Sequence, residues 1–410
     1  MSEAGWAFDA LVADARLAAP HELPGLIARR AAPLGAVDVL VYLVDLQQHS
    51  LVPFSGALGS TIGQGEPLRV DSTVAGHAFQ HLELMIQQQA DERVRVWLPL
   101  QCGTERLGVL ALSLAAEGAE DLSQSLLGAR LRRFASRVAE LVMNKTMYGD
   151  TIVRLRRQAD MGLAAELQWS LLPPLTFAGR SVTVAGALEP AYQVAGDSLD
   201  YAVDDVVTRA AVFDGMGHGL RSAQLAAIAI AAYRNARRSG CSLAATVAAI
   251  HQASLDAFTD TVFTTGVMVE LDSDTGMFSW VNAGHPEPLL LRDGRLVRAL
   301  RCRPTLPLGL HIETGALATS VEVGYEPLEP GDLVLLYSDG VTEARSPDGD
   351  FFGEQRLIDL LTRNLAAQLP VAETIRRMIR SLLEHQQGQL SDDATLLLLG
   401  WRNNPVTAPS

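Results

Sequence analysis

Two adjacent prolines, Pro173 and Pro174, divide the chain into stretches with different patterns. Before them, apolar residues recur with alternating steps of four and three, which is typical of a long helix or a coiled coil. After them, short β-like runs alternate with helical patterns. Neither proline can continue a helix, so the helix must end before them. The 410 residues therefore predict two or three domains in an α/β chain.

Residues 1–126 have the pattern of a compact α/β domain. Pro20 interrupts its first helical stretch, and Gly103 lies near the turn of an expected hairpin. The expected elements are a helix at 8–33, strands at 37–45 and 51–54, a glycine-rich loop at 56–65, a helix at 72–81, and hairpin strands at 94–101 and 108–114.

Residues 127–175 predict a linker helix, continuous up to the prolines. Five positions fit a step of 3.5 residues, namely Leu127, Leu131, Phe134, Val138 and Leu141. Lys145, Gly162 and Glu166 occupy later positions and weaken the pattern. Two interpretations stay open: the seam of a parallel coiled-coil homodimer, or an ordinary helix packed on its own domain.

Residues 176–401 predict a second domain, and residues 402–410 a disordered tail. The expected strands are at 182–186, 206–213, 278–281, 333–337 and 395–399, and the expected helices at 222–238 and 243–256.

Lysine is almost absent: Lys145 is the only one among 33 basic residues. A phosphate-binding P-loop needs a lysine after its glycines, and a protein kinase needs one on a strand. Lys145 fits neither pattern, so nucleotide hydrolysis by either fold is excluded.

The formal net charge of −14 disfavours nucleic acid and anionic membranes as partners. No apolar run approaches the roughly 18 residues that span a bilayer, and the first residues are acidic rather than basic. We expect a cytoplasmic protein. Cys102, Cys241 and Cys302 lie far apart, which predicts reduced thiols rather than a disulfide framework or a zinc cluster.

Four aspartates of the second domain lie at the edges of strand-like runs, each beside a small or turn-forming residue. They are Asp197 after Ala195-Gly196, Asp214 before Gly215-Met216-Gly217, Asp339 between Ser338 and Gly340, and Asp392 before Asp393-Ala394-Thr395. A strand end fixes the backbone, and a neighbouring glycine lets the chain turn away from the carboxylate.

If the four carboxylates converge, their repulsion calls for cations. Mg²⁺ or Mn²⁺ suits an all-oxygen site, and two such ions can activate a water and hold a phosphoryl group. Hydrolysis of a phosphate ester is the chemistry that follows. The alternative for each Asp-Gly pair is an ordinary turn, and spacing alone does not show that the four meet.

At these residues the chain resembles the SpoIIE-like branch of the metal-dependent PPM protein phosphatases, over roughly residues 160–401. The motifs, in the family's order, are Leu167-Gln168-Trp169-Ser170-Leu171-Leu172-Pro173, Pro190-Ala191, Ala195-Gly196-Asp197, Asp214-Gly215-Met216-Gly217-His218-Gly219, Asn282-Ala283-Gly284-His285-Pro286, Pro330-Gly331-Asp332, Tyr337-Ser338-Asp339-Gly340-Val341-Thr342-Glu343 and Asp392-Asp393-Ala394-Thr395.

The resemblance implies an αββα sandwich that holds two Mn²⁺ or Mg²⁺ ions. By the family pattern their ligands are the carboxylates of Asp197, Asp214, Asp339 and Asp392 and the carbonyl of Gly215. It also implies a serine/threonine phosphatase whose substrate is a phosphorylated anti-sigma-factor antagonist.

Departures from the family pattern are few. Ala195 replaces a glycine, Ser198-Leu199 replace aromatic residues, and Ser338 stands where threonine is common. Met216 occupies the place of a histidine proposed as general acid in related phosphatases, so water or another group would protonate the leaving group. His218 and His285 are alternative acids, although a histidine in a glycine-flanked loop can simply bind backbone.

Residues 8–145 resemble a GAF domain, a small-molecule sensing module, through Leu98-Pro99-Leu100 and the run at 108–112. Such a domain would bind an unknown small-molecule or protein signal near the 56–65 loop, or serve only for dimerisation. Cys102 and His77 are candidate cofactor ligands; the alternative is that they are ordinary core or surface residues.

The sequence thus predicts a GAF-regulated protein phosphatase in which the helix after Asp214, residues 220–238, receives the signal. Two alternatives stay open: a non-catalytic domain that binds a phosphorylated protein, and a phosphatase of small molecules.

Overall fold

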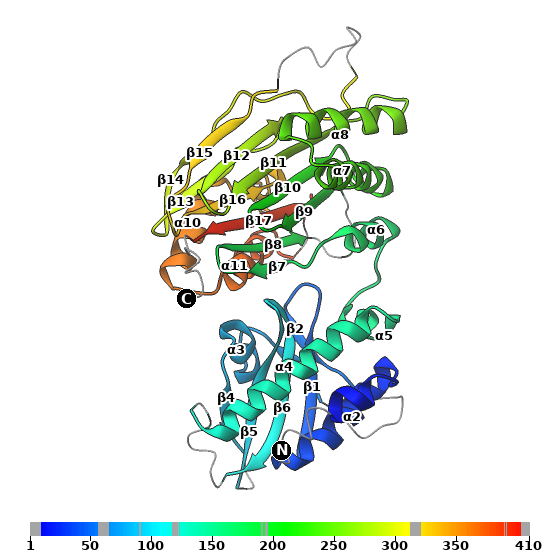
Figure 1. Ribbon diagram of the computed structural model, residues 1–410, viewed down its shortest axis with the longest axis vertical. Helices are drawn as coiled ribbons and strands as arrows, with labels where there is room; N and C mark the ends of the chain where they lie inside the picture. Colours follow the sequence, from blue (N-terminus) through cyan, green and yellow to red (C-terminus); the bar gives the residue numbers. More distant parts are fainter. Residues whose placement is uncertain are drawn as a thin grey trace, which may run out of the picture. The chain divides into compact units, whose positions relative to one another are not determined.

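The chain forms two compact units, Met1–Asp160 and Met161–Ser410, shown in the computed structural model of Figure 1. The structure describes residues 10–55, 65–89, 92–116, 122, 124–189, 192, 196–311, 321–388, 390 and 392–402. Ala195 lies outside this set, as do residues 56–64 of the loop predicted at 56–65 and residues 403–410 of the tail predicted at 402–410.

The first unit is built on one antiparallel sheet, with strand order β3-β2-β1-β6-β5-β4 within the described ranges. Its strands are β1 (Asp38–Val44), β2 (Ser50–Pro53), β3 (Leu68–Arg69), β4 (Met85–Gln88), β5 (Arg93–Cys102) and β6 (Glu105–Ala115). The expected hairpin is confirmed as β5 and β6, and Gly103 adopts a left-handed φ of 59° at its turn.

Helices cover both faces of this sheet. Besides a helical stretch at residues 10–15, they are η1 (Pro20–Glu22), α2 (Leu23–Ala31), η2 (Ala32–Leu34), α3 (Val74–His81), α4 (Leu126–Thr146) and α5 (Asp150–Arg156). Alternate residues of β1 point to opposite faces, so Val39 and Val41 pack with α2 and α4, while Leu40 and Tyr42 pack with α3.

The prediction of one continuous helix from residue 127 to the prolines is wrong. The helix ends at Thr146, a short α5 follows, and residues 157–162 separate α5 from α6 (Leu163–Leu171). Gly149 precedes α5 with an extended backbone, and Arg157 leaves it in a β conformation. The chain therefore turns twice between α4 and α6.

The apolar positions of α4 face their own domain. Leu131, Phe134 and Val138 are fully buried in the core that α4 shares with the sheet. Since these side chains are covered within one chain, they cannot also form a coiled-coil seam. The structure supports the interpretation of an ordinary packed helix.

The second unit is a sandwich of two antiparallel sheets. Their strand orders, within the described residues, are β15-β12-β11-β10-β9 and β14-β13-β16-β17-β8-β7. The strands are β7 (Thr176–Ala178), β8 (Val182–Glu189), β9 (Asp197–Val203), β10 (Val207–Gly215), β11 (Thr264–Asp272), β12 (Met277–Ala283), β13 (Leu289–Arg292), β14 (Arg295–Ala299), β15 (Gly324–Pro327), β16 (Leu333–Tyr337) and β17 (Ala394–Trp401).

Three hydrophobic layers hold the sandwich together. Leu199, Val267 and Leu397 belong to the layer between the sheets. Helices α7 (Leu220–Arg238) and α8 (Leu243–Ala257) cover one outer face, and α10 (Glu354–Ala366) and α11 (Val371–His385) cover the other. A short α9 (Asp339–Thr342) follows β16. This αββα arrangement confirms the predicted fold class (Figure 1).

The second unit begins at Met161 rather than at residue 176, because α6 packs against α7. None of the helices formed by the described residues is long and apolar enough to cross a membrane.

Candidate active site

The predicted site begins where β9 and β10 lie side by side. Asp197 is the first residue of β9, and the antiparallel register places it directly opposite Asp214 of β10. The amide of Gly215 donates to the carbonyl of Gly196 over 2.8 Å and extends this pairing. Strand register alone therefore brings together two of the four predicted carboxylates.

Asp339 and Asp392 meet because Gly340 permits a very close backbone approach. A Cβ atom on Gly340 would lie 1.8 Å from the carbonyl oxygen of Asp393, which no other residue could accommodate without a shift. Glycine thus lets the start of α9 pack against the segment that enters β17, and the charges of Asp339 and Asp392 act on one another. Both side chains are exposed.

Ser338 links the two sheets at this point. Its hydroxyl donates to Asp197 Oδ2 over 2.5 Å and accepts the amide of Thr395 over 2.9 Å. One hydroxyl thereby fixes the buried carboxylate relative to β16 and β17. The prediction that serine replaces threonine here without loss of the hydroxyl is consistent with this contact.

Two residues without a predicted role hold the base of the site. The Asp393 carboxylate accepts the backbone amides of Gly196 and Asp197, the latter over 3.0 Å. The buried Gln168 of α6 donates through Nε2 to the carbonyl of Asp197. Asp393 stands beside a predicted ligand in the Asp392-Asp393 motif, and Gln168 lies in the quoted α6 motif, so both signals were present in the sequence.

Electrostatic repulsion is strong in this cluster. Burial, followed by the charges of Asp214 and Asp393, raises the pKa of Asp197 well above its usual value. Burial and the charges of Asp339, Asp392 and Asp393 raise the pKa of Asp214 to about 7. Burial likewise raises the pKa of Asp393 to about 6, although its two backbone hydrogen bonds oppose the shift. No basic side chain of the described residues is among the causes that oppose these three pKa shifts.

The donor atoms suit a hard divalent cation. All of them are oxygens, and Asp393 Oδ1 is buried without a hydrogen-bond partner among the described residues. The Gly215 carbonyl accepts the Ser222 hydroxyl over 2.7 Å, which leaves its second lone pair available. No three His, Cys, Asp or Glu side chains of the described ranges are placed so that one ion could contact all of them. The carboxylates therefore form an electrostatic cluster rather than a finished coordination sphere.

Comparison with known families matches residues 204–402 to "Stage II sporulation protein E (SpoIIE)". This part of the chain is similar to the SpoIIE family. The match covers just under half of the chain and includes Asp214, Asp339 and Asp392, whereas Asp197 lies just before it.

Curated relatives and solved structures are also similar to this chain. The phosphoserine phosphatase RsbU of Bacillus subtilis is 23% identical over 246 residues, which are 59% of this chain and 70% of that protein. Protein IcfG of Synechocystis is 31% identical over 134 residues, 32% of this chain but only 20% of IcfG. The SiaA PP2C domain of Pseudomonas aeruginosa has a TM-score of 0.48 at 23% identity and covers 59% of this chain and 94% of its own. The RsbU and RsbW domains of Rv1364c from Mycobacterium tuberculosis have a TM-score of 0.46 at 24% identity, with 56% and 61% covered.

The two histidines predicted as alternative acids, His218 and His285, differ in their surroundings. His285 is buried, its Nδ1 lies 2.9 Å from the Thr265 hydroxyl, and its backbone is held by Asn282. Burial lowers the pKa of His285 to about 3, so the ring is neutral near pH 7 and cannot serve as a general acid. His218 is exposed and acts electrostatically on Asp392.

Cys102 and His77 do not form a common cofactor site. Cys102 packs against the core on one face of the first sheet, while α3, which carries His77, covers the other face. His77 instead stacks on His81 with 4.0 Å between ring centroids.

Proposed function

We propose that the chain is a metal-dependent serine/threonine phosphoprotein phosphatase. The observation that carries the proposal is the convergence of Asp197, Asp214, Asp339 and Asp392 from separate strand ends, with a pKa of about 7 at Asp214. Carboxylates held this close together need cations to offset their repulsion, and the similarity to the SpoIIE family supports this requirement.

In this proposal, the carboxylates of Asp197, Asp214, Asp339 and Asp392 and the carbonyl of Gly215 hold two Mn²⁺ or Mg²⁺ ions. When bound, such ions supply an activated water and a clamp for the phosphoryl group. Ser338 orients the Asp197 carboxylate, and Asp393 holds the backbone at the start of β9.

In this proposal, water or the exposed His218 gives the proton to the leaving-group oxygen. His285 is neutral and buried, and Met216 at the mouth of the site has no proton to give. Met216 is 48% exposed, so bulk water reaches this position.

We propose a phosphorylated anti-sigma-factor antagonist as the substrate. The similarity to the phosphoserine phosphatase RsbU supports this choice, as does the exposure of Asp339 and Asp392, which leaves room for a phosphorylated side chain on a protein surface. A small-molecule phosphatase would use the same carboxylates, and a non-catalytic phosphoprotein-binding domain would have no need of them all.

The first unit acts as a GAF-like sensor in this proposal, and α6 carries the signal. Arg234 of α7 donates both to the Leu171 carbonyl at the end of α6, over 2.5 Å, and to the buried Asp200 of β9, over 2.7 Å. Arg237 also binds Asp200, over 2.9 Å. A shift of α6 would therefore act on α7 and on the strand that begins with Asp197.

We also propose a homodimer in the cytoplasm, now without a coiled coil. Large apolar side chains at Leu17, Met147 and Leu163 are exposed and offer surface for a second copy. Light scattering coupled to size exclusion would measure its mass directly.

The proposal predicts that Asp214→Asn lowers hydrolysis of p-nitrophenyl phosphate in Mn²⁺ by about 100-fold or more, because one carboxylate ligand is lost. Asp205→Asn is the matched control, since this exposed residue lies in the turn before β10. Circular dichroism checks the fold of both variants.

Undiminished turnover by Asp214→Asn would contradict the proposal. Absence of turnover in the unsubstituted chain, together with tight binding of a phosphoserine protein, would favour the non-catalytic alternative. Faster release of phosphate from metabolites than from phosphoproteins would favour the small-molecule alternative.

A further inference from the structure

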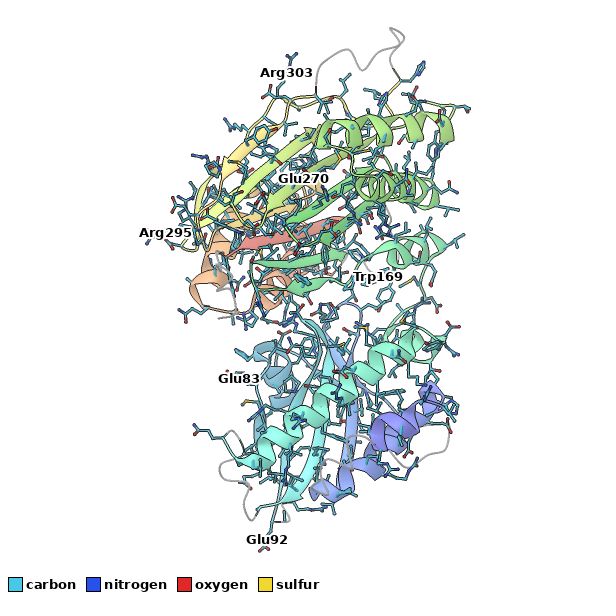
Figure 2. All side chains as sticks on the ribbon, viewed as in Figure 1. Glu83, Glu92, Trp169, Glu270, Arg295 and Arg303 are labelled. Atoms are coloured by element: carbon cyan, nitrogen blue, oxygen red, sulfur yellow. The ribbon has the colours of Figure 1, made fainter. Side chains whose placement is uncertain are left out.

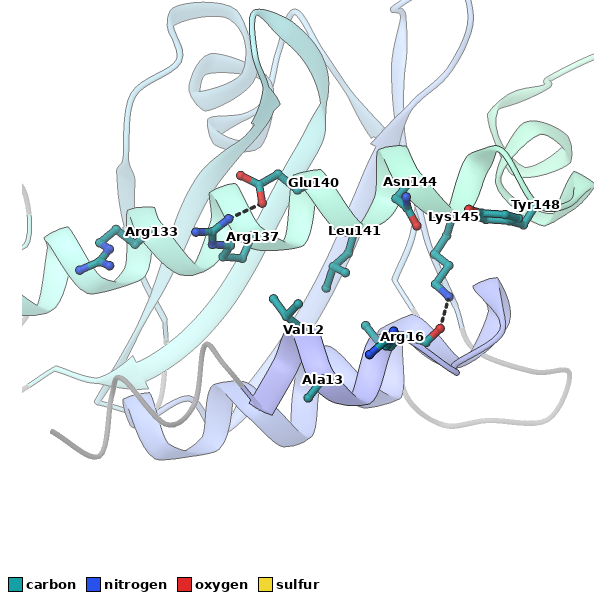
Figure 3. A pocket seen from close by; sticks show the side chains of 11 residues that line it. Val12, Ala13, Arg16, Arg133, Arg137, Glu140, Leu141, Asn144, Lys145 and Tyr148 are labelled. Atoms are coloured by element: carbon teal, nitrogen blue, oxygen red, sulfur yellow. Dashed lines mark hydrogen bonds and ion pairs between the residues drawn. The ribbon is translucent and has the colours of Figure 1, made fainter. Parts of the chain in front are cut away.

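The first unit contains a cavity of about 1210 Å³ between residues 10–15 and α4, shown in Figure 3. Its described lining comes only from these two helical segments and the residues that follow them. The lining residues are Val12, Ala13, Ala15, Arg16, Arg133, Arg137, Glu140, Leu141, Asn144, Lys145 and Tyr148.

The lining is strongly basic although the whole chain carries a net charge of −14. It contains four basic side chains and one acidic side chain. Glu140 is engaged by Arg137 in an ion pair of 2.6 Å, and the described lining contains no second carboxylate. A cavity with this balance attracts anions.

Lys145, the chain's only lysine, is the most informative residue of the cavity. Its side chain is nine-tenths buried, with a relative exposure of 9%. Its ammonium donates to the carbonyl of Arg16 over a long 3.5 Å (Figure 3), and no carboxylate of the described residues lies within ion-pair distance. Burying an unpaired ammonium costs several kcal/mol, and one long hydrogen bond offsets little of it.

Arg16 adds a second cation beside Lys145. It is exposed on the other segment of the cavity, and its guanidinium has no ion-pair partner within the described part of the chain. The rest of this side of the cavity is apolar or neutral: Val12, Ala13 and Leu141 offer hydrocarbon surface, and Asn144 offers an amide. The lining thus combines an anion-binding end with an apolar wall.

We propose that this cavity binds a small amphipathic organic anion. Its carboxylate, phosphate or sulfonate pairs with Lys145 and Arg16, and its apolar part lies against Val12 and Leu141. The ion pair supplies the counter-charge that the buried ammonium lacks. This site lies in the first unit, whereas the aspartate cluster lies in the second, and it does not depend on phosphatase activity.

The single lysine makes the site directly observable. Reductive methylation of the full chain with ¹³C-formaldehyde labels Lys145 and the terminal amine only, and dimethylation keeps the positive charge. The Lys145 signal is assigned by its absence in Lys145→Met. The probe is 8-anilinonaphthalene-1-sulfonate. Two partial probes serve as controls: N-phenyl-1-naphthylamine has the apolar part without the charge, and inorganic phosphate has charge without the apolar part.

We expect the anilinonaphthalene sulfonate to shift the Lys145 signal with a saturable dependence that matches its fluorescence titration. Lys145→Met and Arg16→Met should each weaken this binding about tenfold or more, because a charge-assisted contact is lost. Arg130→Met, on α4 but outside the cavity, should change it less than about twofold. Both partial probes should bind more weakly than the complete one.

The proposal would be overturned if Arg16→Met and Lys145→Met both bound the probe as tightly as the unsubstituted chain does, or if probe fluorescence rose without movement of the Lys145 signal. Equally tight binding of the uncharged probe would also overturn it, because the cavity would then be merely apolar. Arg16 is exposed, so its variant tests the proposal even if Lys145→Met fails to fold.

Discussion

The aspartate cluster of the second unit and the basic cavity of the first present the same physical problem with opposite sign. Both gather like charges around a buried charged residue, Asp197 in one and Lys145 in the other, and in both proposals the opposite charge comes from outside the described chain. Their construction differs. Strand register and backbone contacts position the aspartates, whereas side chains on two helical segments line the cavity. Substitutions that disturb the backbone should therefore have the largest effect on the aspartate cluster, and substitutions that remove a charge should have the largest effect on the basic cavity.

The largest effect should come from one added methyl group under the aspartate cluster. In Gly340→Ala the new Cβ would meet the Asp393 carbonyl at 1.8 Å, so α9 and the entry to β17 must separate. We expect a loss of about 3 kcal/mol in the free energy of unfolding and little remaining phosphatase activity. Urea unfolding and p-nitrophenyl phosphate hydrolysis measure the two.

The control for this variant is Gly149→Ala between α4 and α5. No atom lies within 4 Å of a Cβ there, and the backbone is extended. If Gly340→Ala and Gly149→Ala both caused only a small loss of stability and activity, the claim that backbone contacts position the aspartates would be contradicted.

His285 should make the second unit sensitive to acid. The pKa of His285 is about 3 in the folded state, against a usual value of 6.5. Between pH 3 and pH 6.5, His285 is therefore protonated in the unfolded chain but neutral in the folded chain. The contribution of His285 to the free energy of unfolding is therefore complete above pH 6.5. It decreases as the pH falls toward 3, by up to about 1.4 kcal/mol per pH unit. His285→Asn should flatten this slope in urea unfolding from pH 6.5 to pH 4.

The exposed His21 provides the matched control, because His21→Gln should leave the slope unchanged. An equal slope in the chain with and without His285 would show that the buried ring does not resist protonation.

Gln168 should have a smaller effect, specific to the proposed metal site. Gln168→Leu keeps the approximate volume but removes the donor to the Asp197 carbonyl. We expect activity to fall about tenfold and the Mn²⁺ concentration for half-maximal activity to rise, as for partners that orient metal ligands. Ser170→Ala, exposed on the same helix, should change neither. A loss that Mn²⁺ concentration does not influence would assign Gln168 a purely structural role.

Much of the site could be predicted because strand ends carry strong local signals. Asp197 and Asp214 stand at the edges of apolar runs, and β9 and β10 place them opposite one another. Gly340 was visible as a turn residue, but its contact with the Asp393 carbonyl depends on tertiary packing and leaves no local trace. The role of Asp393 was not predicted, because the ligand set needed only one of the two adjacent aspartates and Asp392 was assigned to it.

The linker was mispredicted because apolar periodicity does not identify the surface that covers it. Leu131, Phe134 and Val138 would suit a second helix as well as the sheet on which they pack. The sequence prediction also omitted α10 and α11, although Leu357, Ile358 and Leu361 follow a helical period. No pattern of single residues located the basic cavity, since its lining comes from segments more than 100 residues apart in the sequence.

Mn²⁺ binding measured by isothermal titration calorimetry tests the central claim most directly. The account predicts that the purified chain binds two Mn²⁺ ions and that Asp339→Asn, which removes an exposed carboxylate without disturbing the buried contacts, binds at least one fewer. The account would be contradicted if the unsubstituted chain bound no more Mn²⁺ than the folded Asp339→Asn variant.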